Sequence, residues 1–142
     1  MSLRMIILLI VISFPALASI ATADDLRIAN GRVRMPIGGE DPTVFFVIQS
    51  KSKETRTIVG ASSPRSESVS IRRTAIVEGQ WGSEAMPDGM AIPPGGAVAF
   101  APRGLFLRMM SAEKLAAGDV VPITLNFANG ESVSFDAVTK GE

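Results

Sequence analysis

Apolar and polar residues alternate along most of the chain after about residue 25, which is the pattern of half-buried β-strands. The alternating segments are rich in Val, Ile, Thr and Phe and are separated by Gly, Pro and Asn-Gly turn signals. They predict about nine strands, at residues 26–34, 43–50, 55–62, 67–77, 89–92, 96–101, 105–110, 119–127 and 130–138. This succession of short strands predicts an all-β domain with a Greek-key sandwich or barrel architecture.

The last two strands give the clearest pattern. A turn is predicted at Ala128-Asn129-Gly130, because Asn-Gly favours the tight turn of a β-hairpin. Apolar residues occupy every second position on both sides of this turn, so one face of each strand is predicted to pack into the core. The predicted core positions of the hairpin are Val121, Ile123, Leu125, Phe127, Val133, Phe135 and Ala137.

Three segments depart from the strand pattern. Residues 111–117 predict a short connecting helix, in which Ser111 is the cap and Gly118 ends the turn. Residues 35–42 and 78–94 are rich in Gly and Pro and predict loops, and loops held by a β-scaffold are frequent binding sites. The second loop is the stronger candidate site, although its Trp81 and methionines are also the residue types that cover the end of a core.

The first 23 residues have the features of a secretory signal peptide. Arg4 is followed by an apolar stretch over residues 5–18 and by the small residues Ala21-Thr22-Ala23. We expect cleavage after Ala23, with Ala18 as the second choice. An uncleaved membrane anchor is the alternative, which Pro15 and the small residues disfavour. The prediction is a leader at 1–23 and a mature periplasmic domain at 24–142, without a second segment long enough to span a membrane.

Charge gives the mature domain no general affinity for polyanions. Of the 14 Lys and Arg residues, one, Arg4, lies in the leader, which leaves 13 against 14 Asp and Glu. A nearly neutral domain has no electrostatic reason to bind nucleic acid or an anionic membrane. The expected partner is instead a periplasmic protein or a small ligand.

The chain has no histidine and no cysteine. It therefore lacks the usual proton shuttle at neutral pH and the commonest ligands of zinc, and Ser-His and Cys-His chemistry are excluded. An enzyme would need paired carboxylates or an activated lysine. The acidic pairs Asp24-Asp25 and Glu40-Asp41 lie beside the leader and in a Gly-Pro turn, where we expect solvated loop charges, so we predict that the protein is not an enzyme.

Six segments, in order, resemble the PCu(A)C family of periplasmic copper chaperones over nearly the whole mature chain. The most specific are Val-Gly-Ala-Ser-Ser-Pro at 59–64, Ile-Pro-Pro-Gly-Gly at 92–96 and Gly-Asp-Val-Val-Pro-Ile-Thr-Leu at 118–125. The others are residues 32–36, 43–51 and 68–71. The resemblance implies a cupredoxin-like β-domain and, for the family, carriage of Cu(I) toward the CuA centre of cytochrome oxidase.

In the resembling family, copper is bound by a His and a Met with ten residues between them, followed after twenty-one more residues by a His-x-Met. Counted without gaps, these positions are Arg73, Glu84, Phe106 and Arg108. If Val69 and Ile71 face inward, strand alternation moves the first position to Arg72 and the second to Ser83. In either alignment the family's ligands are replaced, and a guanidinium does not coordinate Cu(I).

Three interpretations of this replacement stay open, and the simplest is that these arginines are ordinary solvated surface residues. Glu84 between Arg73 and Arg108 would form an ion-paired structural cluster, whereas arginines beside Trp81 would form an anion pocket. Our leading hypothesis is a binding or accessory domain without a cofactor, whose copper site is replaced. The alternative is weak Cu(I) binding by methionines alone, serving delivery toward cytochrome oxidase assembly. The thioether candidates are Met86, Met90 and Met109.

Overall fold

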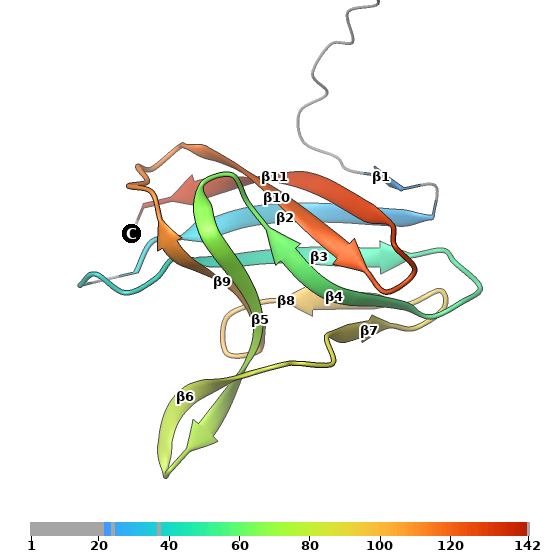
Figure 1. Ribbon diagram of the computed structural model, residues 1–142, viewed down its shortest axis with the longest axis horizontal. Helices are drawn as coiled ribbons and strands as arrows, with labels where there is room; N and C mark the ends of the chain where they lie inside the picture. Colours follow the sequence, from blue (N-terminus) through green and yellow to red (C-terminus); the bar gives the residue numbers. More distant parts are fainter. Residues whose placement is uncertain (1–21, 24, 37, 142) are drawn as a thin grey trace, which may run out of the picture.

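The computed structural model describes residues 22–23, 25–36 and 38–141 (Figure 1). The predicted leader, apart from Thr22 and Ala23, and Asp24 lie outside the described residues. The strands of the described part are β1 (Thr22–Ala23), β2 (Leu26–Arg34), β3 (Thr43–Ser50), β4 (Arg56–Ser62), β5 (Ser66–Val77), β6 (Gln80–Ala85), β7 (Met90–Ile92), β8 (Ala97–Phe100), β9 (Leu105–Ala112), β10 (Val120–Phe127) and β11 (Ser132–Lys140). The all-β prediction is confirmed, and each of the nine predicted strands is present. In the described residues no helix is long and apolar enough to cross a membrane.

The strands form one sheet that closes on itself. Its order is β6-β5-β9-β8-β3-β2-β11-β10-β4-β7, and β1 pairs with β2. A pairing between Ala61 and Val69 joins β4 to β5, so the strands between them in the order close into a barrel. Neighbouring strands are mostly antiparallel, but β11 pairs with β2, and β8 with β9, in parallel. The β5–β6 hairpin projects away from the barrel (Figure 1).

Alternate side chains from these strands fill the interior of the barrel. All seven predicted core positions of the β10–β11 hairpin are buried. Phe46 from β3 stacks on Phe100 from β8, with ring centroids 4.4 Å apart, and its centroid lies 4.9 Å from that of Phe135 in β11. Aromatic contacts of this kind contribute beyond the area that they bury, so Phe46 ties three strands together.

The predicted helix at 111–117 is wrong. β9 continues to Ala112, and the following residues are an irregular connection. The Glu113 N–H donates to the Arg65 carbonyl at 2.9 Å, so the backbone still bonds across to the segment that precedes β5. The Ala116 N–H donates to the Asp119 carboxylate at 2.9 Å. One tertiary bond and one local bond to a side chain thus satisfy backbone groups that a helix would have used.

The predicted loop at 78–94 is also wrong in its first half. Gln80–Ala85 forms β6, which pairs with β5 from Val77↔Gln80 to Arg72↔Ala85. Trp81 is 77% exposed, so it does not cover the end of the core. The rest of the segment holds β7, which pairs with β4.

Gly89 lets the segment before β7 approach β4 closely. Its φ of +75° lies in the left-handed region, and a Cβ at this position would be 2.0 Å from the Ile58 carbonyl oxygen. Only glycine combines that backbone conformation with that approach.

Candidate functional site

The positions predicted to correspond to the family's copper ligands lie on β5, β6 and β9, where β5 pairs with both of the other strands. Arg72 of β5 is directly opposite Phe106 of β9, and Ser70 is opposite Arg108. Directly paired residues share one face of a sheet, so Arg72, Phe106 and Arg108 lie on the same face. Ile71, one residue away, is buried in the core on the other face.

An open hollow of about 550 Å³ lies on this face. Three of the replaced-ligand positions line it, which are Ser83, Phe106 and Arg108. The loop before β3 contributes Glu40 and Asp41 to the opposite wall. The hollow therefore lies between the β5–β6 hairpin and the predicted 35–42 loop, whose acidic pair belongs to it.

Arg72 is bound to Ser83 across the hairpin. Its Nε donates to Ser83 Oγ at 2.8 Å, and its Nη2 donates to the Ser83 carbonyl oxygen at 3.1 Å. Arg72 is half-buried. The structure thus brings together the two positions that strand alternation selects.

Arg73 and Glu84 lie on the opposite face of the hairpin. They are direct partners in the register, and Arg73 Nε donates to Glu84 Oε1 at 3.1 Å, with Nη2 bonded to the same oxygen. Both side chains are about half exposed. Glu84 does not lie between Arg73 and Arg108, so the three-membered cluster expected from the gapless alignment does not form.

Arg108 instead pairs with Asp41. Its Nε donates to Asp41 Oδ2 at 2.8 Å, which ties the loop before β3 to β9. The Met109 N–H donates to the Pro42 carbonyl at 3.0 Å beside it. The sequence predicted a solvated loop charge at Asp41, so this contact was not expected.

The methionine candidates occupy the interior. Met109 has no exposed surface and belongs to the core cluster, and Met86 and Met90 are partly buried and pack against that cluster. Met109 follows Arg108 in β9, so alternation directs it away from the hollow.

The side chains in the hollow do not fit Cu(I). Copper in this oxidation state prefers thiolate, thioether or imidazole ligands. Ser83, Phe106 and Arg108 offer hydroxyl, phenyl and guanidinium groups, and the loop before β3 adds only carboxylates. Arg72, which is bound to Ser83, offers a second guanidinium. Guanidinium groups carry a fixed positive charge and no lone pair for a metal. Across the part of the chain that the structure describes, no three His, Cys, Asp or Glu residues are grouped so as to hold a metal ion. The chemistry of the hollow favours recognition by hydrogen bonds and ion pairs.

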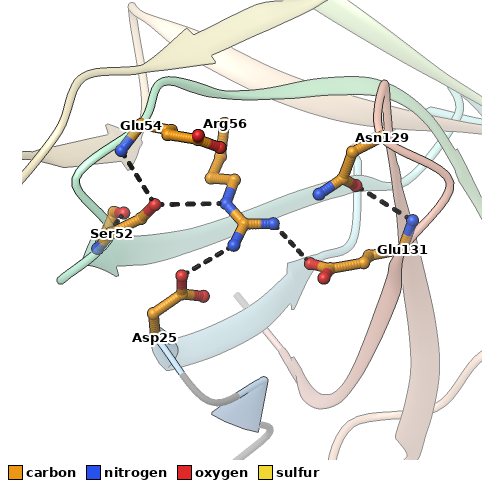
Figure 2. A network of polar contacts seen from close by, with 7 residues as sticks. Asp25, Ser52, Glu54, Arg56, Asn129 and Glu131 are labelled. Carbon is orange, nitrogen blue, oxygen red and sulfur yellow. Dashed lines mark hydrogen bonds and ion pairs between the residues drawn. The ribbon is translucent and has the colours of Figure 1, made fainter.

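A second polar cluster surrounds Arg56 at the start of β4 (Figure 2). Its Nη2 donates to Asp25 at 2.7 Å, its Nη1 to Glu131 at 2.6 Å, and its Nε to Ser52 Oγ at 3.4 Å. The hydrogen bond to Asp25, together with the charges of Asp25 and Glu131, raises the pKa of Arg56 above its ordinary value, against an opposing effect of burial. Asp25 was expected to be a solvated loop charge, but it holds this arginine. Each guanidinium nitrogen has a partner, so the cluster joins three segments and leaves no open site.

A family model described as "Putative lipoprotein LpqE-like" matches residues 26–139. Among curated proteins, the "Putative lipoprotein Lxx21020" of Leifsonia xyli is 25% identical over 111 residues. That match covers 78% of this chain and 66% of the lipoprotein, so the chain spans just under two thirds of the length of that relative.

Solved structures with the same fold include PCuAC domains. The copper-bound PCuAC domain of PmoF2 has a TM-score of 0.67 at 20% identity, over 86% of this chain and 98% of that domain. The Cu(I) form of DR1885 from Deinococcus radiodurans has a TM-score of 0.64 at 25% identity, over 78% of this chain and 75% of that protein.

Proposed function

The chain belongs to the LpqE-like family, and from that premise we propose that it is an exported, non-catalytic binding or accessory protein whose Cu(I) site has been replaced. Its fold is that of the PCuAC domains. The observation that carries the proposal is the contact between Arg72 and Ser83, which ties together two positions where the resembling family has a histidine and a methionine.

The replacement is consistent across the four positions. Arg72 and Ser83 are bonded to each other, Arg108 is bonded to Asp41, and Phe106 lines the hollow between them. Three of the four replaced positions, Arg72, Ser83 and Arg108, thus make specific polar contacts. The new contacts support a surface that binds a partner through guanidinium and hydroxyl groups.

Export to the cell envelope is part of the proposal. The predicted leader and the lipoprotein names of the family and of the Leifsonia xyli relative support it. We propose that the mature protein acts in the periplasm, where it contacts a protein or a small ligand.

Competition for Cu(I) tests the loss of copper chemistry. The purified protein is titrated with Cu(I) held by a coloured chelator such as bicinchoninic acid. The proposal expects the chelator to keep its metal, because the hollow offers no soft donor. Removal of one equivalent of Cu(I) from the chelator contradicts it.

A triple variant, Met86→Leu, Met90→Leu and Met109→Leu, identifies the ligands if copper is taken up. Loss of uptake in this variant would support the methionine-only alternative, with delivery of Cu(I) as its function. The variant keeps the side-chain volumes of the core nearly constant, so its fold is expected to persist.

A further inference from the structure

The β5–β6 hairpin continues past the wall of the barrel. β5 pairs with β9 only as far as Arg73↔Leu105, and its last residues pair with β6 alone. β6 ends the strand order of the sheet, so its second edge has no strand beside it among the described residues. Figure 1 shows this hairpin standing clear of the barrel.

The turn of the hairpin determines which backbone groups face outward. Glu78 and Gly79 have φ values of 51° and 78°, the signature of a type I′ two-residue turn. In such a hairpin, backbone bonds to the neighbouring strand join every second pair of residues. The bond from the Met86 N–H to the Ile71 carbonyl, at 3.1 Å, keeps to that alternation.

By the same alternation, the backbone groups of Trp81, Ser83 and Ala85 point away from β5. Among the described residues, the bond from Arg72 Nη2 to the Ser83 carbonyl is the contact made to these groups. The Arg72 guanidinium therefore reaches across β6 to its free edge. The edge is a row of donors and acceptors matched to an extended polypeptide.

The side chains beside this edge combine apolar surface with one unpaired charge. Ile76 and Trp81 are direct partners on the face of Arg72 and are 65% and 77% exposed. Arg72 makes no ion pair with any described carboxylate, whereas Arg73 on the other face is paired with Glu84. A ligand on this face thus meets an apolar pair and, beside Ser83 two residues further along β6, the Arg72 guanidinium, which is bonded to Ser83 but to no described carboxylate.

We propose that the free edge of β6 binds an extended segment of a partner polypeptide, which pairs antiparallel with β6. In this arrangement a carboxylate of the segment faces Ser83 and bonds to Arg72, and an apolar side chain two residues later faces Trp81. The inference rests on the proposed binding function and gives it a class of partner. The proposed binding surface, the free edge of β6, lies outside the hollow but on the same face of the sheet as Arg72.

The charge of Arg72 favours an acidic polypeptide segment over two other possible occupants of the edge, a second copy of the chain and a lipid bilayer. A second copy paired symmetrically would present its own Trp81, Ser83 and Ala85 on the face of Arg72, none of which is acidic. A lipid bilayer would have to accept Glu78 at the apex of the turn, and burying a carboxylate there is unfavourable. Of these three occupants, a different polypeptide is the one that supplies the carboxylate that Arg72 lacks.

Trp81 is a built-in probe, because the chain has one tryptophan and no tyrosine. The full protein is titrated with the capped peptide Thr-Thr-Glu-Thr-Val-Thr-Thr while Trp81 emission is followed. We expect a saturable blue shift, and an affinity about tenfold higher than that of the matched peptide with Gln in place of Glu, because a charge-assisted hydrogen bond is lost. This preference should disappear in Arg72→Gln and persist in the control Arg73→Gln.

Three results would overturn the inference. They are the absence of a saturable shift with the Glu peptide, equal affinities of the two peptides, and a preference that survives in Arg72→Gln. A Trp81 shift that depends on protein concentration alone would assign the edge to a second copy, and a shift with phosphatidylcholine vesicles would assign it to a membrane. The proposed function is tested separately by the Cu(I) competition, which uptake of copper would contradict. A failure of the proposed function can therefore be distinguished from a failure of the peptide-binding inference.

Discussion

Arg72 donates two hydrogen bonds to Ser83, one to the side chain at 2.8 Å and one to the backbone carbonyl at 3.1 Å. These residues lie eleven positions apart on the two strands of one hairpin. The resembling family places a histidine and a methionine at this separation. Under the proposed function, this polar contact takes the place of a metal bridge between the same two strands.

Gly89 provides a test of the close approach between the segment before β7 and β4. We expect Gly89→Ala to lower the free energy of unfolding by about 1–3 kcal/mol more than Gly79→Ala, because its Cβ would overlap the Ile58 carbonyl. Gly79 is a matched control, since its φ is also positive but nothing lies within 4 Å of its Cβ position. Urea denaturation measures both variants. Equal losses would show that β4 moves aside without penalty.

Arg56 joins three segments of the barrel, so Arg56→Gln is expected to lower the urea midpoint. The raised pKa of Arg56 means that this stabilisation is complete below the ordinary pKa of arginine and is lost only as the pH rises through the higher folded value. The urea midpoints of wild type and Arg56→Gln are therefore compared at about pH 7 and at about pH 9. The wild type should have the higher midpoint at both pH values, by a similar difference. Arg73→Gln is the control, whose exposed pair with Glu84 should matter less. A larger loss in the control would contradict this ranking.

Glu78 lies in the left-handed region at the turn of the β5–β6 hairpin, where Asn is preferred. We expect Glu78→Asn to remove part of a penalty of about 1 kcal/mol and so to slow hydrogen exchange at hairpin amides such as that of Gly82. Amides of the β10–β11 hairpin serve as the internal reference. Unchanged exchange at Gly82 would mean that the turn does not limit opening of the hairpin.

Strict alternation made the β10–β11 hairpin predictable, since its seven predicted core positions, from Val121 to Ala137, are all buried. β6 was missed because Gln80–Ala85 contains glycine, glutamate and alanine, and only one side of the strand pairs with another strand. The helix expected after Ser111 failed for a different reason. Its local cap signals were outweighed by bonds to distant segments, which local sequence does not contain.

The candidate site was predictable only in part, because some of its contacts join segments that are distant in the chain. Alternation from Val69 and Ile71 selects Arg72, and the register places it beside Ser83 and Phe106. The partner of Arg108 was not predictable, because Asp41 is 67 residues away in the chain. Ion pairs of that separation depend on the closed barrel and leave no pattern in the neighbouring sequence.

Restoring the ligands tests the central claim, that the hollow is a replaced copper site. The fourfold variant Arg72→His, Ser83→Met, Phe106→His and Arg108→Met places two imidazoles and two thioethers on one face. The control keeps the last two changes but carries Arg73→His and Glu84→Met, which lie on the opposite face. Cu(I) competition should show one equivalent bound by the first variant and none by the control. Equal uptake by both variants, or none by either, would contradict the account.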